Sequence, residues 1–196
     1  TSTSVTGLTA NTTYFLHVRS YCGGIDYSAW MTFSFFTGYC TPAPSSVDGQ
    51  GITNVNMGTI NNTTVNEAGN YGDYSAQTTN VYETQLVSCA ITYKTGYTYG
   101  TQIWVDWNNN LSFLDAGELV YTGISTSNNP TTLTASFTVP SGQPLGNYRI
   151  RIGGTDNDPG PGNPCYTGSY GCFEDYTLTV IRSEERRVGK ECRSRW

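Results

Sequence analysis

One stretch of this chain, Trp104-Val105-Asp106-Trp107-Asn108-Asn109-Asn110-Leu111-Ser112-Phe113-Leu114-Asp115-Ala116-Gly117-Glu118, joins an apolar segment to a loop rich in oxygen-bearing side chains. In the apolar segment, Ile103, Val105 and Trp107 fall on one face, and Trp104 and Asp106 fall on the other. Alternation with a period of two residues predicts a half-buried β-strand. The polar loop is therefore expected to begin where this strand leaves its sheet.

The same alternation recurs along the chain, and helical periodicity is nearly absent. Clusters such as Asn128-Asn129-Pro130 and Pro140-Ser141-Gly142 mark turns between the alternating segments. Short strands separated by frequent turns are typical of a β-sandwich. We therefore predict an all-β fold, an antiparallel β-sandwich of the jelly-roll or immunoglobulin-like kind. The alternating segments are residues 87–93, 132–139, 148–152 and 176–180.

Composition narrows the class of protein. Only 13% of the 196 residues are charged, and Gly, Thr, Asn and Tyr are abundant, as in secreted β-proteins. No apolar run is long enough to span a bilayer, so no membrane insertion is expected. Residues 1–181 hold four basic and twelve acidic side chains, a net charge of −8, so a nucleic-acid partner is not expected.

The last fifteen residues differ from the rest, because they hold six of the ten Lys and Arg residues. Their sequence, Arg182-Ser-Glu-Glu-Arg-Arg-Val-Gly-Lys-Glu-Cys-Arg-Ser-Arg-Trp196, resembles the conceptual translation of a sequencing-adapter oligonucleotide. We interpret residues 182–196 as an artefactual tail and exclude them from the fold. The alternative is a basic tail that binds nucleic acid or anionic lipid. On the first interpretation, the parent protein is expected to continue beyond Ile181.

Three segments precede this tail. Residues 1–38 form part of one domain, residues 39–46 a linker, and residues 47–181 a sandwich with its own core. Pro42 and Pro44 in the linker favour an extended, semi-rigid spacer. The first segment has only two or three strands, so its apolar face is expected to lack cover and to be poorly stable alone.

Without the tail, five cysteines remain as disulfide candidates. An odd number in a secreted chain suggests that one thiol is free or pairs outside this segment. Pairing of Cys165 with Cys172 would close a small loop, and pairing of Cys22 with Cys40 would link two modules. The alternative is that some of the cysteines are buried and reduced, packing as small hydrophobes. The candidates are Cys22, Cys40, Cys89, Cys165 and Cys172.

The first segment is similar to the end of a fibronectin type III domain. The similarity rests on the run from Val5 to Arg19 and on the strand expected at residues 30–36. It implies that residues 1–38 are the C-terminal strands of such a domain. It also implies that Leu8 and Tyr14 belong to a tyrosine corner, in which the tyrosine hydroxyl bonds back to the preceding turn.

Residues 40–181 resemble a GEVED domain, a module of secreted and cell-surface bacterial proteins. The matching features keep the family's order and spacing over nearly the whole segment. The namesake motif is altered, because Cys172 and Phe173 stand where the family usually has Glu and Val. The family also commonly has Asp at the positions of Asn110 and Ser112 and Gly at that of Leu111. The features are Tyr39-Cys40 and residues 52–55, 58–62, 71–74, 104–118, 139–140, 146–151 and 171–176.

The polar loop is a candidate calcium site. Oxygen-bearing side chains at every second position can turn toward one centre, and calcium takes six to eight oxygen ligands. Only three of the candidates are carboxylates, and Leu111 replaces a residue type that tolerates positive φ, so binding is expected to be weak. The alternative is a polar loop held by Asx-type hydrogen bonds. The candidate ligands are Asp106, Asn108, Asn110, Ser112, Asp115 and Glu118.

Glu174 and Asp175 form an adjacent pair of carboxylates. Such a pair can serve general acid–base chemistry. It can also pair with Arg149 and Arg151, which lie on one face of a neighbouring strand. We predict the structural ion pair.

Catalysis finds little support in the sequence. The only histidine is His17, in the first segment, and no zinc-protease, nucleophile-elbow or phosphate-loop motif is present. The family resemblance implies a non-catalytic adhesive or structural module, with neighbouring domains of the parent protein and cell-surface glycans or proteins as partners. The alternative is a substrate- or carbohydrate-binding accessory domain of a secreted hydrolase such as a protease. Its sugar-stacking platform would be Tyr97, Tyr99, Trp104 and Trp107.

Overall fold

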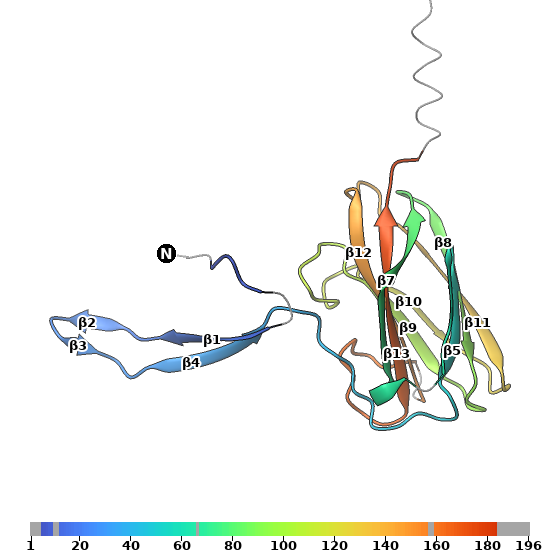
Figure 1. Ribbon diagram of the computed structural model, residues 1–196, viewed down its shortest axis with the longest axis horizontal. Helices are drawn as coiled ribbons and strands as arrows, with labels where there is room; N and C mark the ends of the chain where they lie inside the picture. Colours follow the sequence, from blue (N-terminus) through green and yellow to red (C-terminus); the bar gives the residue numbers. More distant parts are fainter. Residues whose placement is uncertain (1–4, 10–11, 66, 157–158, 184–196) are drawn as a thin grey trace, which may run out of the picture. The chain divides into compact units, whose positions relative to one another are not determined.

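The computed structural model describes residues 5–9, 12–65, 67–156 and 159–183 (Figure 1). The chain divides into two compact units, residues 1–40 and residues 41–196. Residues 184–196, most of the predicted tail, lie outside the described part of the chain. Among the described residues, no helix is long and apolar enough to cross a membrane.

The first unit consists of two small antiparallel ladders. Nearly every side chain in its strands is exposed, including Phe15 at 63% and Phe33 at 51%. This is the uncovered apolar surface that so few strands must leave. The ladders pair β1 (Thr13–Val18) with β4 (Met31–Phe36) and β2 (Tyr21–Gly23) with β3 (Asp26–Tyr27).

Tyr14 in β1 bonds back to the residues before it. Its hydroxyl accepts a hydrogen bond from the Thr9 N–H at 2.8 Å, the type of bond that the resemblance implied for this side chain. The ring also stacks on Phe35 in the partner strand, with centroids 5.9 Å apart. Tyr14 therefore ties the incoming chain to the β1–β4 ladder.

The second unit is a β-sandwich, which confirms the predicted fold class (Figure 1). One sheet has the strand order β10-β9-β12-β13-β7, and the other has the order β11-β8-β5-β6. A single turn of 3-10 helix, η1 (Ala68–Asn70), precedes β7. The strands are β5 (Ile52–Met57), β6 (Ile60–Thr63), β7 (Tyr71–Val81), β8 (Leu86–Tyr93), β9 (Gly100–Val105), β10 (Leu119–Ile124), β11 (Thr131–Thr138), β12 (Gly146–Thr155) and β13 (Gly171–Val180).

One strand pair departs from the antiparallel prediction. β13 pairs antiparallel with β12 but parallel with β7, with Phe173 opposite Tyr71 near the starts of both strands. β6, which precedes η1 and β7, belongs to the opposite sheet. The chain thus changes sheets before β7 and enters it at the same end as β13. Alternation along a strand reveals its faces but not its direction, so the sequence could not predict this pair.

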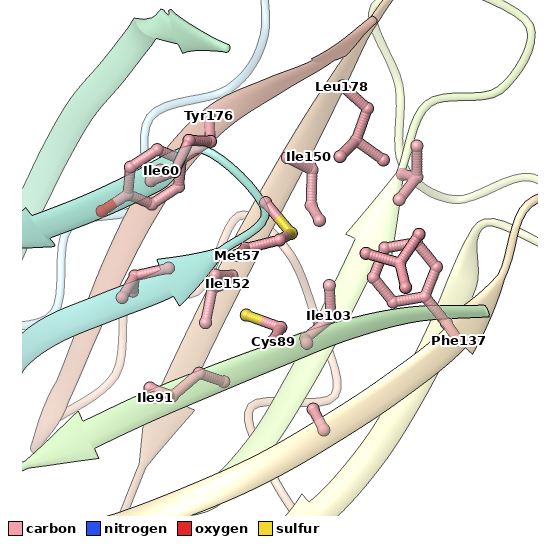
Figure 2. Close-up of a cluster of buried hydrophobic side chains, with 14 of the residues drawn as sticks. Met57, Ile60, Cys89, Ile91, Ile103, Phe137, Ile150, Ile152, Tyr176 and Leu178 are labelled. Atoms are coloured by element: carbon pink, nitrogen blue, oxygen red, sulfur yellow. The ribbon is translucent and has the colours of Figure 1, made fainter. Parts of the chain in front are cut away.

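The core lies between the two sheets and follows the predicted alternation. Figure 2 shows Ile150, Ile152 and Leu178 of the five-stranded sheet facing Met57 and Ile91 of the four-stranded sheet. All five side chains are fully buried. Each large aliphatic side chain buried in this way contributes about 1.5–3 kcal/mol to stability. The apolar halves of β5, β8, β12 and β13 therefore hold the sandwich together.

The predicted linker is not a free spacer in the structure. Pro42 and Pro44 are buried, and residues 41–46 belong to the second unit. The Ala43 N–H donates to the Tyr166 carbonyl at 2.9 Å, and the Ser45 N–H donates to the Gly168 carbonyl at 2.8 Å. Proline has no N–H to donate, so the residues that alternate with the prolines make the hydrogen bonds. The segment is extended, as expected, but it packs along the loop before β13.

A disulfide joins Cys40 to Cys165. Cys22, Cys89 and Cys172 have free thiols. Neither pairing considered from the sequence is formed. Cys172 cannot reach Cys165, because its side chain points from β13 into the core. The alternative of buried, reduced cysteines applies to Cys89 and Cys172, where burial raises the pKa of both thiols.

Candidate functional site

The polar residues of interest lie on both faces of the five-stranded sheet. In β12 and β13, residues of one parity point into the core and those of the other parity point outward. Arg151 is opposite Asp175 in the strand register, and both point away from the core. Glu174, the next residue along β13, must point the other way. Adjacent carboxylates therefore have different surroundings.

Arg151 and Asp175 form a fully buried ion pair. The Arg151 Nε–H donates to Asp175 Oδ1 at 2.7 Å, and its Nη2–H donates to Oδ2 at 2.8 Å. The Nη1–H donates to the Pro164 carbonyl at 2.9 Å. Burial disfavours the cation, but the hydrogen bonds and charge of Asp175 outweigh burial and raise the pKa of Arg151. This bidentate geometry is the strongest form of an arginine–carboxylate contact.

Aromatic rings cover the guanidinium of Arg151. The Phe113 ring lies with its centroid 4.8 Å from the Arg151 Cζ, and the Tyr71 ring lies 5.5 Å away. The Tyr71 hydroxyl also donates to Asp175 Oδ2 at 2.9 Å. Burial, together with the charge of Asp175, raises the pKa of Tyr71. Phe113 comes from the polar loop, so that loop forms a lid over the ion pair.

Arg149 extends the pair toward solvent. Its Nη1 lies 3.3 Å from Asp175 Oδ2 and 3.2 Å from Asp73 Oδ1. The Arg149 side chain is 22% exposed and that of Asp73 is 54% exposed. Arg149 and Arg151 therefore both pair with Asp175, which is one of the two carboxylates predicted to bind them.

Glu174 does not pair with either arginine, which corrects the prediction for this residue. It points into the sandwich, where Thr64 donates to its Oε1 at 2.8 Å and Tyr176 donates to its Oε2 at 2.6 Å. Burial raises the pKa of Glu174 to about 8, although the two hydroxyl donors oppose the shift. A hydrogen bond with Glu67 raises it further. Its surroundings thus favour the protonated form of Glu174.

The polar loop between β9 and β10 folds as a series of Asx-type turns. Asp106 accepts the backbone N–H groups of Asn110 and Leu111 at 3.2 and 2.9 Å. The side-chain oxygens of Asn108, Asn110 and Ser112 each accept the N–H two residues further on. This is the hydrogen-bonded loop considered as the alternative to a calcium site. Leu111 has a φ of 69°, so it adopts the left-handed conformation predicted to be costly for it.

Two further carboxylates close this loop. Asp115 Oδ2 accepts the amide N–H groups of Asn108 and Asn110 at 3.2 and 2.7 Å. Glu118 is only 2% exposed, and its Oε2 accepts the Asp115 N–H at 3.1 Å. Burial raises the pKa of Glu118, and the charges of Asp106 and Asp115 raise it further. The loop therefore brings three carboxylates into electrostatic contact.

All six predicted ligands thus belong to one hydrogen-bonded loop. Among the described residues, no three His, Cys, Asp or Glu side chains are grouped in a way that could hold a metal by themselves. A cation in this loop would depend on amide, hydroxyl or backbone oxygens as well. Calcium accepts such mixed oxygen ligands, whereas zinc prefers nitrogen and sulfur.

The predicted sugar-stacking platform is not assembled. Trp104 is 3% exposed and Tyr99 is fully buried, with its hydroxyl bonded to Asp48. Trp107 is half-buried and packs on Tyr148. Of the four residues, only Tyr97 is exposed, at 57%. These aromatic rings serve mainly as packing.

Sequence reasoning missed the residues that complete the two polar clusters. Phe113 and Pro164 cover Arg151 from loops, and Thr64 and Glu67 bond Glu174 from the opposite side of the core. Phe113 carried one usable signal, because it is a large apolar residue in the middle of a polar loop. The other three carry no local signal, since their roles depend on contacts with residues far along the chain.

Comparison with known proteins gives one family. Residues 100–179 match the model of the GEVED domain, which supports the resemblance noted from the sequence. The match spans nearly all of β9 to β13, including the polar loop and both members of the buried ion pair. GEVED is a small β domain found in bacterial extracellular proteins. No curated protein matches the chain.

Proposed function

We propose that the GEVED domain at residues 100–179, together with the strands before it, is a non-catalytic structural and adhesive module of a secreted or cell-surface bacterial protein. The family occurs in bacterial extracellular proteins. The Cys40–Cys165 disulfide is also of the kind that persists in oxidising compartments outside the cytosol.

The observation that carries the proposal is the buried ion pair of Arg151 and Asp175. Both side chains are fully buried and saturated with hydrogen bonds, so neither can bind or turn over a substrate. Their neighbours Tyr71 and Phe113 complete the enclosure. The buried pair therefore links β12 to β13 and to the loops that carry Phe113 and Pro164.

The remaining acid–base candidates also favour a structural role. Glu174 bonds to Thr64 and Tyr176 inside the sandwich, where substrate cannot enter. His17 belongs to the first unit, where its Nδ1 bonds to the Thr32 hydroxyl at 2.8 Å. A hydrolase would need an accessible acid, base or nucleophile.

The proposal is tested with the intact chain in two assays. First, hydrolysis of casein, nitrophenyl esters and nitrophenyl glycosides is measured for the wild type and for Asp175→Asn. We expect no turnover in either. Turnover that is lost in Asp175→Asn, while the circular dichroism spectrum stays native, would make the domain an enzyme and refute the proposal.

Second, binding to a glycan array and to immobilised bacterial cell-surface protein is measured. An adhesive module should bind the protein fraction or cell-wall glycans without any hydrolysis of them. Saturable binding to a polysaccharide that Tyr97→Ala abolishes, and the matched change Tyr170→Ala retains, would instead favour an accessory domain of a hydrolase. Both tyrosines are exposed, at 57% and 46%, so neither change should affect folding.

A further inference from the structure

Two glutamates meet inside the sandwich, near the starts of β7 and β13. Glu174 is fully buried, and the half-buried Glu67, just before η1, forms a hydrogen bond with it. Gly72 lies opposite Glu174 in the parallel β7–β13 pair. A Cβ at position 72 would press on the Tyr74 ring and lie 3.1 Å from the Glu67 Cγ. The glycine therefore leaves Glu67 the room to reach across β7 to Glu174.

The contact between the two carboxyl groups requires a proton. Ionised carboxylates only accept hydrogen bonds, so Glu67 and Glu174 can bond to each other only when one of them is protonated. Each nearby tyrosine hydroxyl serves one carboxyl group: Tyr74 donates to Glu67 Oε1 at 3.2 Å, and Tyr176 donates to Glu174 Oε2 at 2.6 Å. Burial raises the pKa of Glu174 to about 8, which favours this residue as the one that carries the proton.

No basic side chain among the described residues faces Glu174 inside the sandwich. Arg149 and Arg151 pair with Asp175 on the other face of the sheet. The titratable groups that face Glu174 from the elements packed around it can ionise only to anions. Loss of the proton would therefore leave two carboxylates side by side without a cation, and like charges repel. These groups are Glu67 before η1, Tyr74 of β7, Cys89 and Tyr93 of β8, and Cys172 and Tyr176 of β13.

We propose that a proton held between Glu67 and Glu174 latches η1 and the start of β7 onto the sandwich, and that loss of this proton as pH rises releases them. Glu174 is itself held by Thr64 and Tyr176, so Glu67 is the partner that moves. The single turn η1 moves with Glu67, because the Asn70 N–H donates to the Glu67 carbonyl at 3.0 Å.

Release of η1 also affects the buried ion pair. Tyr71 follows η1 directly, and its hydroxyl donates to Asp175 Oδ2 at 2.9 Å. Movement of η1 therefore withdraws one hydrogen-bond donor from Asp175. The latch thus links a proton inside the sandwich to the ion pair of Arg151 and Asp175, which joins β12 to β13.

The direction of the pH effect follows from proton binding. The closed latch binds the proton more tightly than the open one, in which Glu174 is open to water and ionises near its ordinary pKa of 4.5. The equilibrium constant for opening should therefore rise between about pH 5 and pH 8, approaching about tenfold per pH unit, and level off above that range.

The test is hydrogen–deuterium exchange of the intact chain, measured by mass spectrometry at two pH values. Comparison with Glu174→Gln at the same pH cancels the intrinsic pH dependence of amide exchange, and this variant keeps a neutral side chain of the same shape. Between about pH 5.5 and pH 7.5, opening at residues 67–72 should rise about 100-fold more in the wild type than in Glu174→Gln. The same rise in both proteins, or no rise in either, would overturn the proposal.

A second variant identifies the partner of Glu174 even if Glu174→Gln fails to fold. Glu67→Gln alters a half-buried side chain, and its amide can donate to the ionised Glu174, so opening should no longer rise with pH. Glu83→Gln is the matched control, because this exposed carboxylate accepts the Gly142 N–H, and the variant should keep the wild-type rise. A wild-type rise in Glu67→Gln, or its loss in Glu83→Gln, would refute the assignment of the latch to Glu67.

Exchange in β9 distinguishes local release from unfolding of the whole sandwich. All six residues of β9 are buried, so its amides exchange only when the sheet itself opens. The equilibrium constant for opening should be at least about tenfold larger for residues 67–72 than for residues 101–105 at both pH values. Equal opening of the two segments would mean that pH acts on the whole sandwich, and the latch would then be wrong.

Discussion

Replacing Arg151 with methionine removes the guanidinium from the outer face of the sandwich while keeping an apolar side chain of similar reach. Asp175 then remains buried without its bidentate partner. The Pro164 carbonyl also loses the Arg151 N–H, and Phe113 and Tyr71 lose the cation between them. The change therefore isolates a buried charge and leaves the apolar core unaltered.

The contacts that Asp175 keeps in Arg151→Met determine how much stability the variant loses. Breaking a buried pair by removing one partner costs about 3–5 kcal/mol, because the other charge is left uncompensated. Asp175 keeps the Arg149 guanidinium at 3.3 Å and the Tyr71 hydroxyl at 2.9 Å. We therefore expect the lower part of this range, about 3–4 kcal/mol, which lowers the Tm by about 6–16 °C.

The loss of unfolding free energy is measured by unfolding the intact chain in guanidinium chloride and monitoring its far-UV circular dichroism. Arg149→Met is the matched control, and because its ion pairs are partly exposed it should cost less than about 1 kcal/mol. The double change Arg151→Met with Asp175→Leu removes both buried charges and should recover most of the stability. The reasoning is refuted if Arg151→Met costs no more than Arg149→Met, or if the double change is no more stable than Arg151→Met alone.

Three other changes test separate parts of the second unit. Glu174 is protonated in the folded chain up to about pH 8 but ionises above its usual pKa of 4.5 when unfolded, so stability should fall as pH rises between these values. In Glu174→Gln, denaturant titrations over the same range should lose this slope. Reduction of the Cys40–Cys165 disulfide with dithiothreitol should cost about 2–4 kcal/mol, seen as a lower Tm. Gly154→Ala places a Cβ 2.5 Å from the Tyr93 hydroxyl in the core, which should cost about 1–3 kcal/mol in the same melting assay.

Each of these has a control and a contradicting result. Glu83→Gln should retain the wild-type pH slope, and stability that rises between pH 5 and 8 would contradict the assignment of Glu174. Cys22→Ser should remain sensitive to dithiothreitol, and Cys40→Ser should not. Gly142→Ala meets no atom within 4 Å and has a φ of 78°, so it should cost only about 1 kcal/mol of backbone strain. A cost clearly below about 1 kcal/mol for Gly154→Ala would contradict the prediction, because it would mean that Tyr93 moves aside for the added Cβ.

Alternating patterns predicted β8, β11, β12, part of β9 and the second half of β13, because apolar and polar side chains alternate along these strands. The alternation at residues 132–139 and 148–152 marks the inward side chains of β11 and β12. The pattern also placed Ile103 and Val105 on one face of their strand, and both lie in the core. It placed Trp104 and Asp106 on the opposite face. Alternation along a strand does not predict which strands are neighbours in a sheet.

Strand neighbours decided the details of the site. Glu174 and Asp175 are adjacent and chemically alike, and only the register with β12 shows that Asp175 faces Arg151. Burial of the outward face depends on two loops that fold back over the sheet, one carrying Phe113 and the other carrying Pro164, and no pattern within either loop predicts this contact. The Cys40–Cys165 disulfide likewise depends on residues 41–46 packing along the chain just before β13.

The Cys40–Cys165 bond also determines which parts of the chain can bear tension. When the chain is pulled from its two ends, force passes through the disulfide, and residues 41–164 form a closed covalent loop outside the load path. That loop contains β5 to β12, so among the sandwich strands only β13 is exposed to the force. Its roughly 124 residues would otherwise release about 400 Å of chain at 3.3 Å per residue. Resistance to extension therefore depends on how strongly β13 is held in the sheet. β13 lies between β12 and β7, and the ion pair of Arg151 and Asp175 joins it to β12.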